Sequence, residues 1–193
     1  MINIAKAPTS SAYITTYNGT EKMTKAKFEL GDDKDETGVY EMTFDINNVS
    51  NQAISYDLDT IVQTEGVSET YTSHDERTVT QDGYLLSGAS LSIMEVSGGT
   101  YSGKTVSIGA KGTAKVTVKV TLSDEDKQYL KDSFENGMYV EGFVTLKAKS
   151  GATVDMNVPL LAFFGDWTKA PIFDEEYYDT NADELNKELD SAD

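Results

Sequence analysis

The sequence has no cysteine and one histidine, and these two shortages exclude several kinds of chemistry. Without thiols the chain has no disulfide, no thiolate nucleophile and no thiolate metal ligand. A Ser-His-Asp triad would have to use His74, but no nucleophile-elbow motif accompanies it, and one histidine is too few for a histidine-based zinc site. We therefore interpret His74 as a solvated loop residue and expect neither catalytic residues nor metal ligands.

Basic residues are also scarce. The chain has 16 Lys and Arg against 33 Asp and Glu, so its net charge at pH 7 is −17. A surface of this sign repels phosphate backbones and anionic lipids, and we expect no nucleic-acid partner and no membrane partner. Cationic ligands and divalent ions are compatible with it.

Long apolar runs are missing as well. The longest, PLLAFF at 159–164, is far shorter than the roughly 20 residues that span a bilayer. The first residues, MINIAKAP, lack the basic start and apolar stretch of a secretion signal. If the protein is exported, we expect this chain to be a piece of something longer.

What the sequence does contain is alternation of apolar and polar residues, which is typical of half-buried antiparallel strands. The pattern is clear in VYEMTFDINNVS (39–50), AISYDLDTIVQTE (53–65) and AKVTVKVTL (114–122). Shorter candidate strands lie between them, separated by Gly and Ser clusters. The residues predicted to face the core are Tyr40, Met42, Phe44, Ile46, Ile54, Tyr56, Leu58, Val62, Val116, Val118, Val120 and Leu122.

One helix is predicted over SDEDKQYLKDSFENG (123–137), because Ser123 is a natural N-cap, acidic residues follow it in the first turn, and Gly137 is a good stop. A hairpin around Ser-Gly-Ala then joins strands at 139–149 and 153–163. A second, short helix is predicted in NADELNKELD (181–190).

About eight strands with one small inserted helix predict an all-β fold, an antiparallel β-sandwich of the immunoglobulin or fibronectin type III kind. A closed β-barrel is the alternative.

Two motifs resemble ligand sites. Gly98, Gly103, Lys104 and Thr105 satisfy the P-loop pattern, but the β-branched segment that follows cannot open a helix, and a hairpin turn is predicted instead. GDDKDETG at 31–38 has calcium-loop spacing, yet the EF-hand glutamate position is Phe44, which favours a polar loop. No cofactor is expected, with weak calcium binding at this acidic loop as the alternative.

The aromatic stretch PLLAFFGDWTKAPIFD (159–174) combines large apolar side chains with the Gly and Pro residues that interrupt regular structure. Together with TLSDEDKQYL, the pair Asn136-Gly137 and YVEGFVTL, it resembles the fibronectin type III-like domain that follows the catalytic domain in cell-envelope subtilisin-like serine peptidases, the lactocepin and streptococcal complement-cleaving peptidase family. The resemblance is dense over 114–174, and MINIAKA is similar to the last helix of a subtilisin catalytic domain.

The resemblance implies a division into the tail of an upstream protease domain (1–12), the sandwich (13–174), and a linker with a short helix towards a next module (175–193). It implies a non-catalytic accessory role in an extracellular, wall-associated serine endopeptidase. The partners would be the protease domain and the next module in cis, and the protein substrates of the parent. An independent surface-binding module for a host protein or glycan is the alternative.

Within this interpretation the aromatic stretch packs one end of the sandwich against its neighbour and sets the angle at which the chain leaves. The residues predicted for this interdomain packing are Phe163, Phe164, Trp167, Ile172 and Phe173. Phe163 is also interpreted as an ordinary core residue of the last strand. A carbohydrate-binding platform that uses Trp167 is a further alternative.

Overall fold

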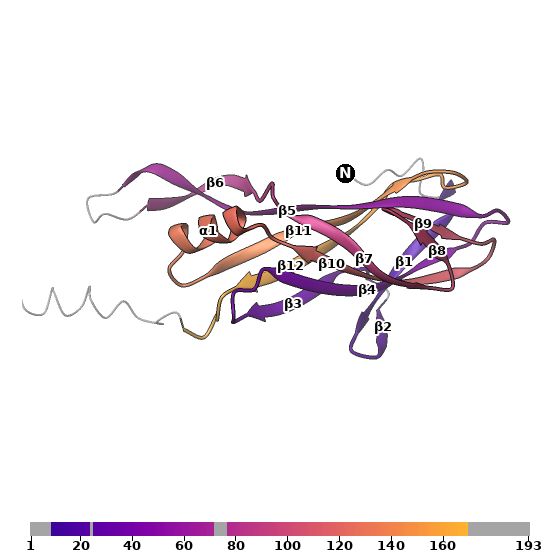
Figure 1. The fold of residues 1–193 in the computed structure, drawn as a ribbon, viewed down its shortest axis with the longest axis horizontal. Coiled ribbons are helices and arrows are strands. Elements are labelled where there is room, and N and C mark those ends of the chain that lie inside the picture. The colour runs from indigo at the N-terminus through magenta and orange to yellow at the C-terminus, as the bar shows by residue number, and fades with distance from the viewer. Residues whose placement is uncertain (1–8, 24, 72–76, 170–193) are drawn as a thin grey trace, which may run out of the picture.

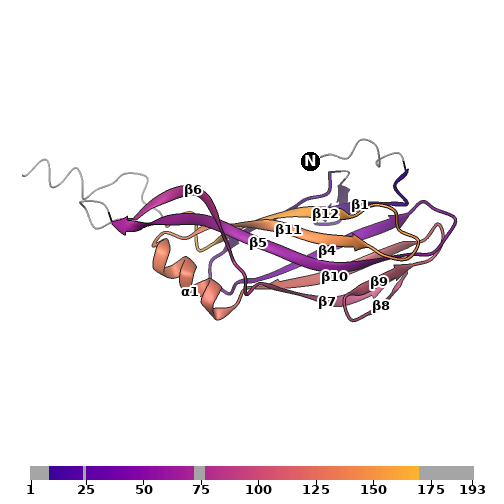
Figure 2. The same cartoon turned by 90° about the horizontal axis from the view of Figure 1, so that it is seen from above.

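The computed structural model describes residues 9–23, 25–71 and 77–169, which form two β-sheets packed face to face (Figures 1 and 2). The five-stranded sheet, here sheet A, has the order β2-β1-β4-β10-β7. The seven-stranded sheet, here sheet B, has the order β3-β12-β11-β5-β9-β8, and β6 also pairs with β5. The predicted all-β sandwich is confirmed, and the chain forms two open sheets rather than the closed barrel that was its alternative.

The strands of sheet A are β1 (Ala12–Asn18), β2 (Glu21–Met23), β4 (Val39–Asn48), β7 (Ser90–Ser97) and β10 (Thr113–Thr121). Those of sheet B are β3 (Phe28–Asp33), β5 (Ile54–Tyr71), β6 (Arg77–Leu85), β8 (Thr100–Ser102), β9 (Thr105–Ile108), β11 (Met138–Ala148) and β12 (Met156–Phe164). The single described helix, α1, spans Asp124–Ser133.

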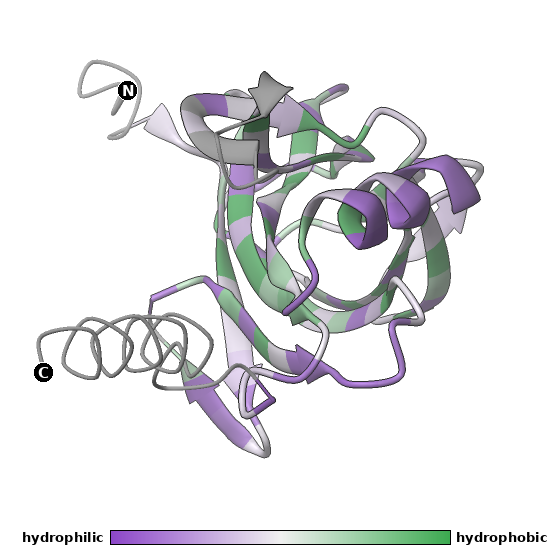
Figure 3. Cartoon of the chain, turned by 90° about the vertical axis from the view of Figure 1, so that its left-hand side faces the viewer, coloured by the Kyte–Doolittle hydropathy of each residue, from purple (hydrophilic) through white to green (hydrophobic). Residues whose placement is uncertain are grey.

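The core lies between the sheets and is built by the alternation seen in the sequence. All twelve residues predicted to face it are buried, from Tyr40 at 4% exposure to Phe44, Ile46, Tyr56 and Leu58 at 0%. Figure 3 shows the pattern as green and purple bands along the strands. Because alternate residues of a strand point to opposite sides of its sheet, each strand contributes every second residue to this layer.

Helix α1 follows β10 and begins where the sequence predicts. The Ser123 hydroxyl accepts a hydrogen bond from the Asp126 backbone N–H, and the Asp126 carboxylate accepts one from the Ser123 N–H, a capping box. The helix ends at Ser133, earlier than expected, because Phe134 has an extended backbone. Leu130 and Phe134 are buried in the core cluster of the sandwich.

The structure has more strands than the sequence predicts, and the extra ones lack clean alternation. In β1 both Thr15 and Thr16 are buried, one on each face, so no period of two is visible. β3 ends in Gly-Asp-Asp, which was expected to be loop; it forms a strand because it pairs in parallel with β12, placing Asp32 opposite Phe163. β5 continues past the predicted end at 65, and with β6 it extends beside α1 (Figure 1).

The glycine-rich motif at 98–105 is tested by the structure, whereas the predictions for the two ends of the chain are not. Gly98, Gly103 and Lys104 lie in and beside the β8–β9 hairpin, which confirms the turn and rules out a P-loop. The helix predicted at 181–190, the segment MINIAKA (1–7) that resembles the end of a protease domain, and His74 lie outside the described residues. Nothing in the structure tests the domain boundaries at 12/13 and 174/175, which stay predictions. None of the helices in the described ranges is long and apolar enough to cross a membrane.

Candidate functional site

The aromatic stretch begins at the end of β12, where the two adjacent phenylalanines point in opposite directions. Phe164 faces the main core and is 2% exposed. Phe163 faces away from the core, on the outer side of sheet B, yet it is only 6% exposed. It is therefore buried, but not as the ordinary core residue that the sequence suggested.

Phe163 is covered by two aromatic rings. Tyr139, its partner across the β11–β12 ladder, lies edge-on with ring centroids 5.3 Å apart. Trp167 lies edge-on to Phe163 at 5.1 Å and is tilted against Tyr139 at 5.4 Å. Aromatic pairs at these separations attract one another beyond the area they bury. Trp167 itself remains 57% exposed, so the three rings form a small outer cluster with an open side.

The backbone that carries Trp167 is tied to the acidic segment 31–38. The Gly165 N–H donates to the Asp33 carbonyl at 3.1 Å, and the Trp167 N–H donates to the Asp32 carboxylate at 3.2 Å. Lys34 forms an ion pair with Asp166 at 3.1 Å. These links hold the chain in place where it leaves the sandwich.

Asp166 accepts the hydrogen bonds and forms the ion pair that hold the chain where it leaves the sandwich. Its carboxylate accepts hydrogen bonds from the Thr168 hydroxyl at 2.6 Å and from the Thr168 backbone N–H at 3.0 Å. These bonds, and then the Lys34 ammonium, stabilise the charged form and lower the pKa of Asp166 from 3.8 to about 2.

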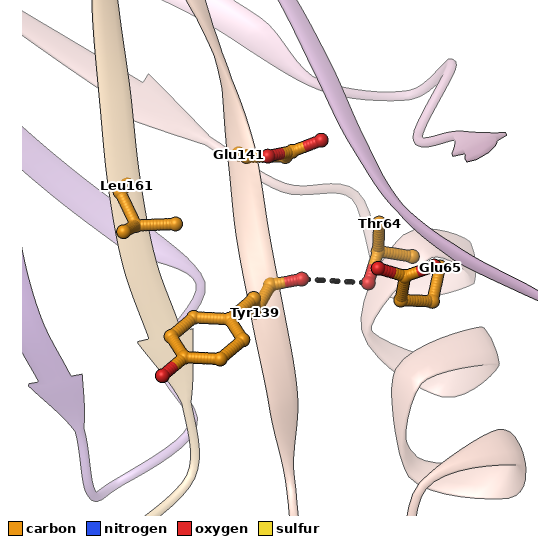
Figure 4. Close-up of a pocket in the computed structure, with 5 residues that line it drawn as sticks. All are labelled: Thr64, Glu65, Tyr139, Glu141 and Leu161. Carbon is orange, nitrogen blue, oxygen red and sulfur yellow. Dashed lines mark hydrogen bonds between the residues drawn. The ribbon is translucent and has the colours of Figure 1, made fainter. Parts of the chain in front are cut away.

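Beside the cluster, the outer face of sheet B is hollowed. One hollow is lined by Thr64 and Glu65 of β5, Tyr139 and Glu141 of β11, and Leu161 of β12 (Figure 4). The Thr64 hydroxyl donates to the Tyr139 carbonyl at 2.7 Å, which fixes the two strands at this point. The hollow has an apolar side formed by Leu161 and Tyr139 and two carboxylates on its other side (Figure 4).

The acidic loop does not gather ligands for a cation in this structure. The Asp33 carboxylate accepts hydrogen bonds from the backbone N–H groups of Thr37 and Gly38 and from the Thr37 hydroxyl. Over the described ranges, no three Asp, Glu or His side chains are grouped as they would be around a metal ion.

Three of the five residues predicted for interdomain packing lie in the described part of the chain. Phe163 and Trp167 lie together in the outer cluster, and Phe164 lies on the opposite face, in the core. Ile172 and Phe173 lie outside the described residues. The interdomain role of all five stays a prediction.

Several exposed residues of this surface were not predicted from the sequence, notably Tyr139, Phe143 and Leu161. The sequence carried a signal for them, because YVEGFVTL and VPLLAFF have apolar residues at both odd and even positions. A strand with one solvent face should alternate, so apolar residues on both faces indicate that the outer face is not simply solvated.

Comparison with known proteins decides the family. The model of the Fn3-like domain matches residues 28–161, which is most of the sandwich. The chain belongs to the Fn3-like domain family. This Fn3-like domain is also 24% identical over 192 residues to the C5a peptidase of Streptococcus pyogenes serotype M1. The alignment covers 94% of this chain and 14% of that peptidase, so the chain spans about one seventh of its relative.

Two solved structures are similar in shape. A family 123 glycoside hydrolase from Clostridium perfringens matches with 4% identity and a TM-score of 0.42, over 75% of this chain and 23% of that one. A PapD-like domain of human CEP192 matches with 11% identity and a TM-score of 0.43, over 86% of this chain and 94% of that one. Neither likeness bears on function. The resemblance stated from the sequence is confirmed at the level of an Fn3-like domain associated with a peptidase.

Proposed function

We propose that this Fn3-like domain is a non-catalytic accessory domain of a secreted, cell-envelope subtilisin-like serine endopeptidase. It supports the protease domain and shapes the access of protein substrates to it. The observation that carries the proposal is the alignment with the C5a peptidase, which runs along 94% of this chain but only 14% of the relative. In the proposed arrangement the catalytic residues belong to a different part of the parent protein.

The geometry of the chain exit supports this role. A domain that positions a neighbour needs a rigid joint. The Trp167 segment is held by hydrogen bonds from the backbone N–H groups of Gly165 and Trp167 and by the Lys34–Asp166 ion pair. The open side of Trp167 then offers a large apolar contact at low entropy cost. In this proposal Trp167 contacts the downstream module, and Ile172 and Phe173 belong to the same contact surface.

The partners in this proposal are the upstream protease domain and the downstream module in cis, together with the protein substrates of the parent. The location is extracellular and associated with the cell wall. The net charge of −17 supports the expectation that neither nucleic acid nor a membrane surface is a partner. No cofactor is required for such a role.

The parent protein can be tested directly. An antibody raised against this chain is used to blot native cells and culture medium, alongside a fluorophosphonate probe that labels active serines. We expect a band several-fold larger than this chain that also takes the probe. A probe-silent band at the size of this chain would overturn the proposal and favour an independent binding module.

The accessory role needs a second test in the parent peptidase. Trp167→Ala should lower kcat/KM for a folded protein substrate while leaving hydrolysis of a short chromogenic peptide unchanged. Tyr101→Ala, at a similarly exposed aromatic residue on β8, is the matched control. Equal loss on both substrates would mean that the substitution damages the catalytic domain and not substrate access.

A further inference from the structure

The outer face of sheet B carries an apolar surface that extends well beyond Trp167, the one part of it that the accessory role uses. The exposed large hydrophobic side chains on it include Ile61 at 51%, Phe143 at 42% and Leu161 at 41%. Antiparallel sheets normally present polar residues to solvent. Contiguous exposed apolar patches on soluble proteins mark interaction sites.

The strand register makes these residues neighbours. Phe143 of β11 lies opposite Ile61 of β5 on one side and opposite Pro159 of β12 on the other, which gives an apolar row across three strands. Leu161 and Tyr139 continue the surface towards the chain exit. We call Ile61, Tyr139, Phe143, Pro159 and Leu161 the outer apolar strip.

The strip is hollowed along its length. Besides the hollow of Figure 4, a second is lined by Leu161, Tyr139 and Trp167, and a third by Phe143, Pro159 and Leu161. Leu161 lines all three, so they are contiguous around it. A protein side chain could enter at Leu161 and contact both neighbouring hollows.

Carboxylates flank the strip. Leu161 lies between Glu29 of β3 and Glu141 of β11 in the ladder, and Glu65 lines the hollow of Figure 4. Glu141 accepts a hydrogen bond from the neutral Gln63 amide at 2.8 Å, so its charge is not neutralised by that contact. Among the residues that line the three hollows, the one base is Lys27, which is paired with Glu29. The occupant of such a surface must be cationic around an apolar centre.

The charge and the apolar centre of the strip argue against three other candidate ligands: a second copy of the chain, its own C-terminal sequence and a glycan. A second copy of the chain carries the same −17 and is repelled. The sequence after Lys169 has nine acids and one lysine, so it is also of the wrong sign. A glycan would bury hydroxyl groups against Ile61, Pro159 and Leu161, which have no side-chain hydrogen-bonding atoms to receive them.

We propose that the outer apolar strip binds a basic polypeptide segment, with an apolar side chain seated at Leu161 and flanking Lys or Arg residues paired with Glu65 and Glu141. The proposal goes beyond the accessory role, because it assigns a binding activity to this chain itself. It applies whether or not the parent is a peptidase.

The test uses the chain and a lysine-rich peptide with a central Phe-Leu pair. Trp167 is the only tryptophan and lies beside Leu161 in one hollow, so its emission reports binding. We expect saturable binding that weakens about tenfold when NaCl rises from about 50 mM to about 500 mM, since salt screens exposed charges. A lysine peptide without Phe-Leu, and a peptide with glutamate in place of lysine, should bind far more weakly.

Variants locate the contact. Leu161→Thr and Phe143→Thr, which keep strand propensity, should each weaken binding by about tenfold. Glu141→Gln should weaken it about threefold at low salt. Met94→Thr and Glu95→Gln on β7 of sheet A are the matched controls, because both side chains are exposed like those of the strip, and they should leave affinity unchanged. Thermal melts confirm that each variant is folded.

Three outcomes would overturn the proposal. If the β7 controls lose as much affinity as the strip variants, the binding is non-specific attraction to an acidic protein. If the peptide does not bind while a cell-wall polysaccharide does, and Trp167→Ala abolishes that binding, the surface is a glycan platform. If neither ligand binds, the strip is not a docking surface. None of these results affects the test for a larger, probe-labelled parent, so the two proposals fail separately.

Discussion

Tyr84 of β6 and Tyr129 of α1 stack face to face, with ring centroids 3.5 Å apart and ring planes 6° apart. The Tyr129 hydroxyl also donates to the Glu65 carbonyl on β5 at 3.2 Å. The extended β5–β6 pair is therefore fastened to the one described helix, at the end of the sandwich where the chain leaves β12 (Figure 1).

This stack should be measurable as a coupling free energy. In a double-mutant cycle of Tyr84→Ala and Tyr129→Ala, urea unfolding should give a coupling of about 1 kcal/mol, as found for aromatic pairs. Tyr129→Phe keeps the ring and removes the hydroxyl, so it separates stacking from the bond to Glu65. Strictly additive alanine variants would mean that the stack does not stabilise the protein.

Gly137→Ala should be strongly destabilising. Gly137 has a φ of +82°, and an added Cβ would lie 2.5 Å from the Phe164 carbonyl and 2.8 Å from the Phe163 ring. The left-handed backbone costs a residue with a side chain about 1–2 kcal/mol, and displacement of β12 adds to it. Gly103→Ala is the control, because Gly103 has a φ of +57° and open space around it. Equal losses in free energy of unfolding for both variants would disprove the close approach.

The start of α1 gives a capping prediction. Ser123→Ala removes the hydroxyl that accepts the Asp126 N–H and should lower the free energy of unfolding by about 1 kcal/mol. Ser123→Gly should cost only about a few tenths, since glycine is tolerated at this position. Chemical denaturation of the three proteins measures both values, and an unchanged Ser123→Ala midpoint would contradict the role of the capping box.

The pH dependence of the chain exit follows from Asp166. Its pKa is lowered from 3.8 to about 2, so the bonds to Thr168 and Lys34 are fully present above about pH 4 and are lost as the pH falls towards 2. The emission of Trp167, which follows Asp166 in the chain, should therefore be steady from pH 7 to about 4 and change below that.

Asp166→Asn tests the assignment. In this variant the change in Trp167 emission between about pH 4 and 2 should be absent or much smaller, while the emission at pH 7 should already be shifted. If the acid transition of the variant matches that of the wild-type chain, a different carboxylate is responsible.

Much of the fold could be predicted because the signals are local. Alternation in 39–50 and 114–122 identified the core-facing residues, and Ser123 with its acidic first turn identified the start of α1. β1 and β3 were missed because neither alternates cleanly. The end of β3 becomes a strand only through its parallel pairing with β12, a partner far along the chain.

The candidate site could also be predicted only in part. The density of aromatic residues in 159–174 pointed to Phe163 and Trp167, whereas the faces on which Phe163 and Phe164 lie depended on the register of β12. The sequence shows that β11 and β12 carry apolar residues on both faces, but it could not show that these residues form one strip with Ile61, because Ile61 and Leu161 belong to strands far apart in the sequence.

The sequence by itself therefore determined the all-β class, the composition of the core layer, the helix cap and the excess of negative charge. These depend on the period of a strand, the chemistry of a helix terminus and a sum over side chains, all of which are local or additive. Only the tertiary structure decided which strands are neighbours, and so which exposed side chains share one surface. Strand pairing is chosen by packing across the whole sandwich, and a period of two says which residues share a face of one strand but not which strand lies beside it.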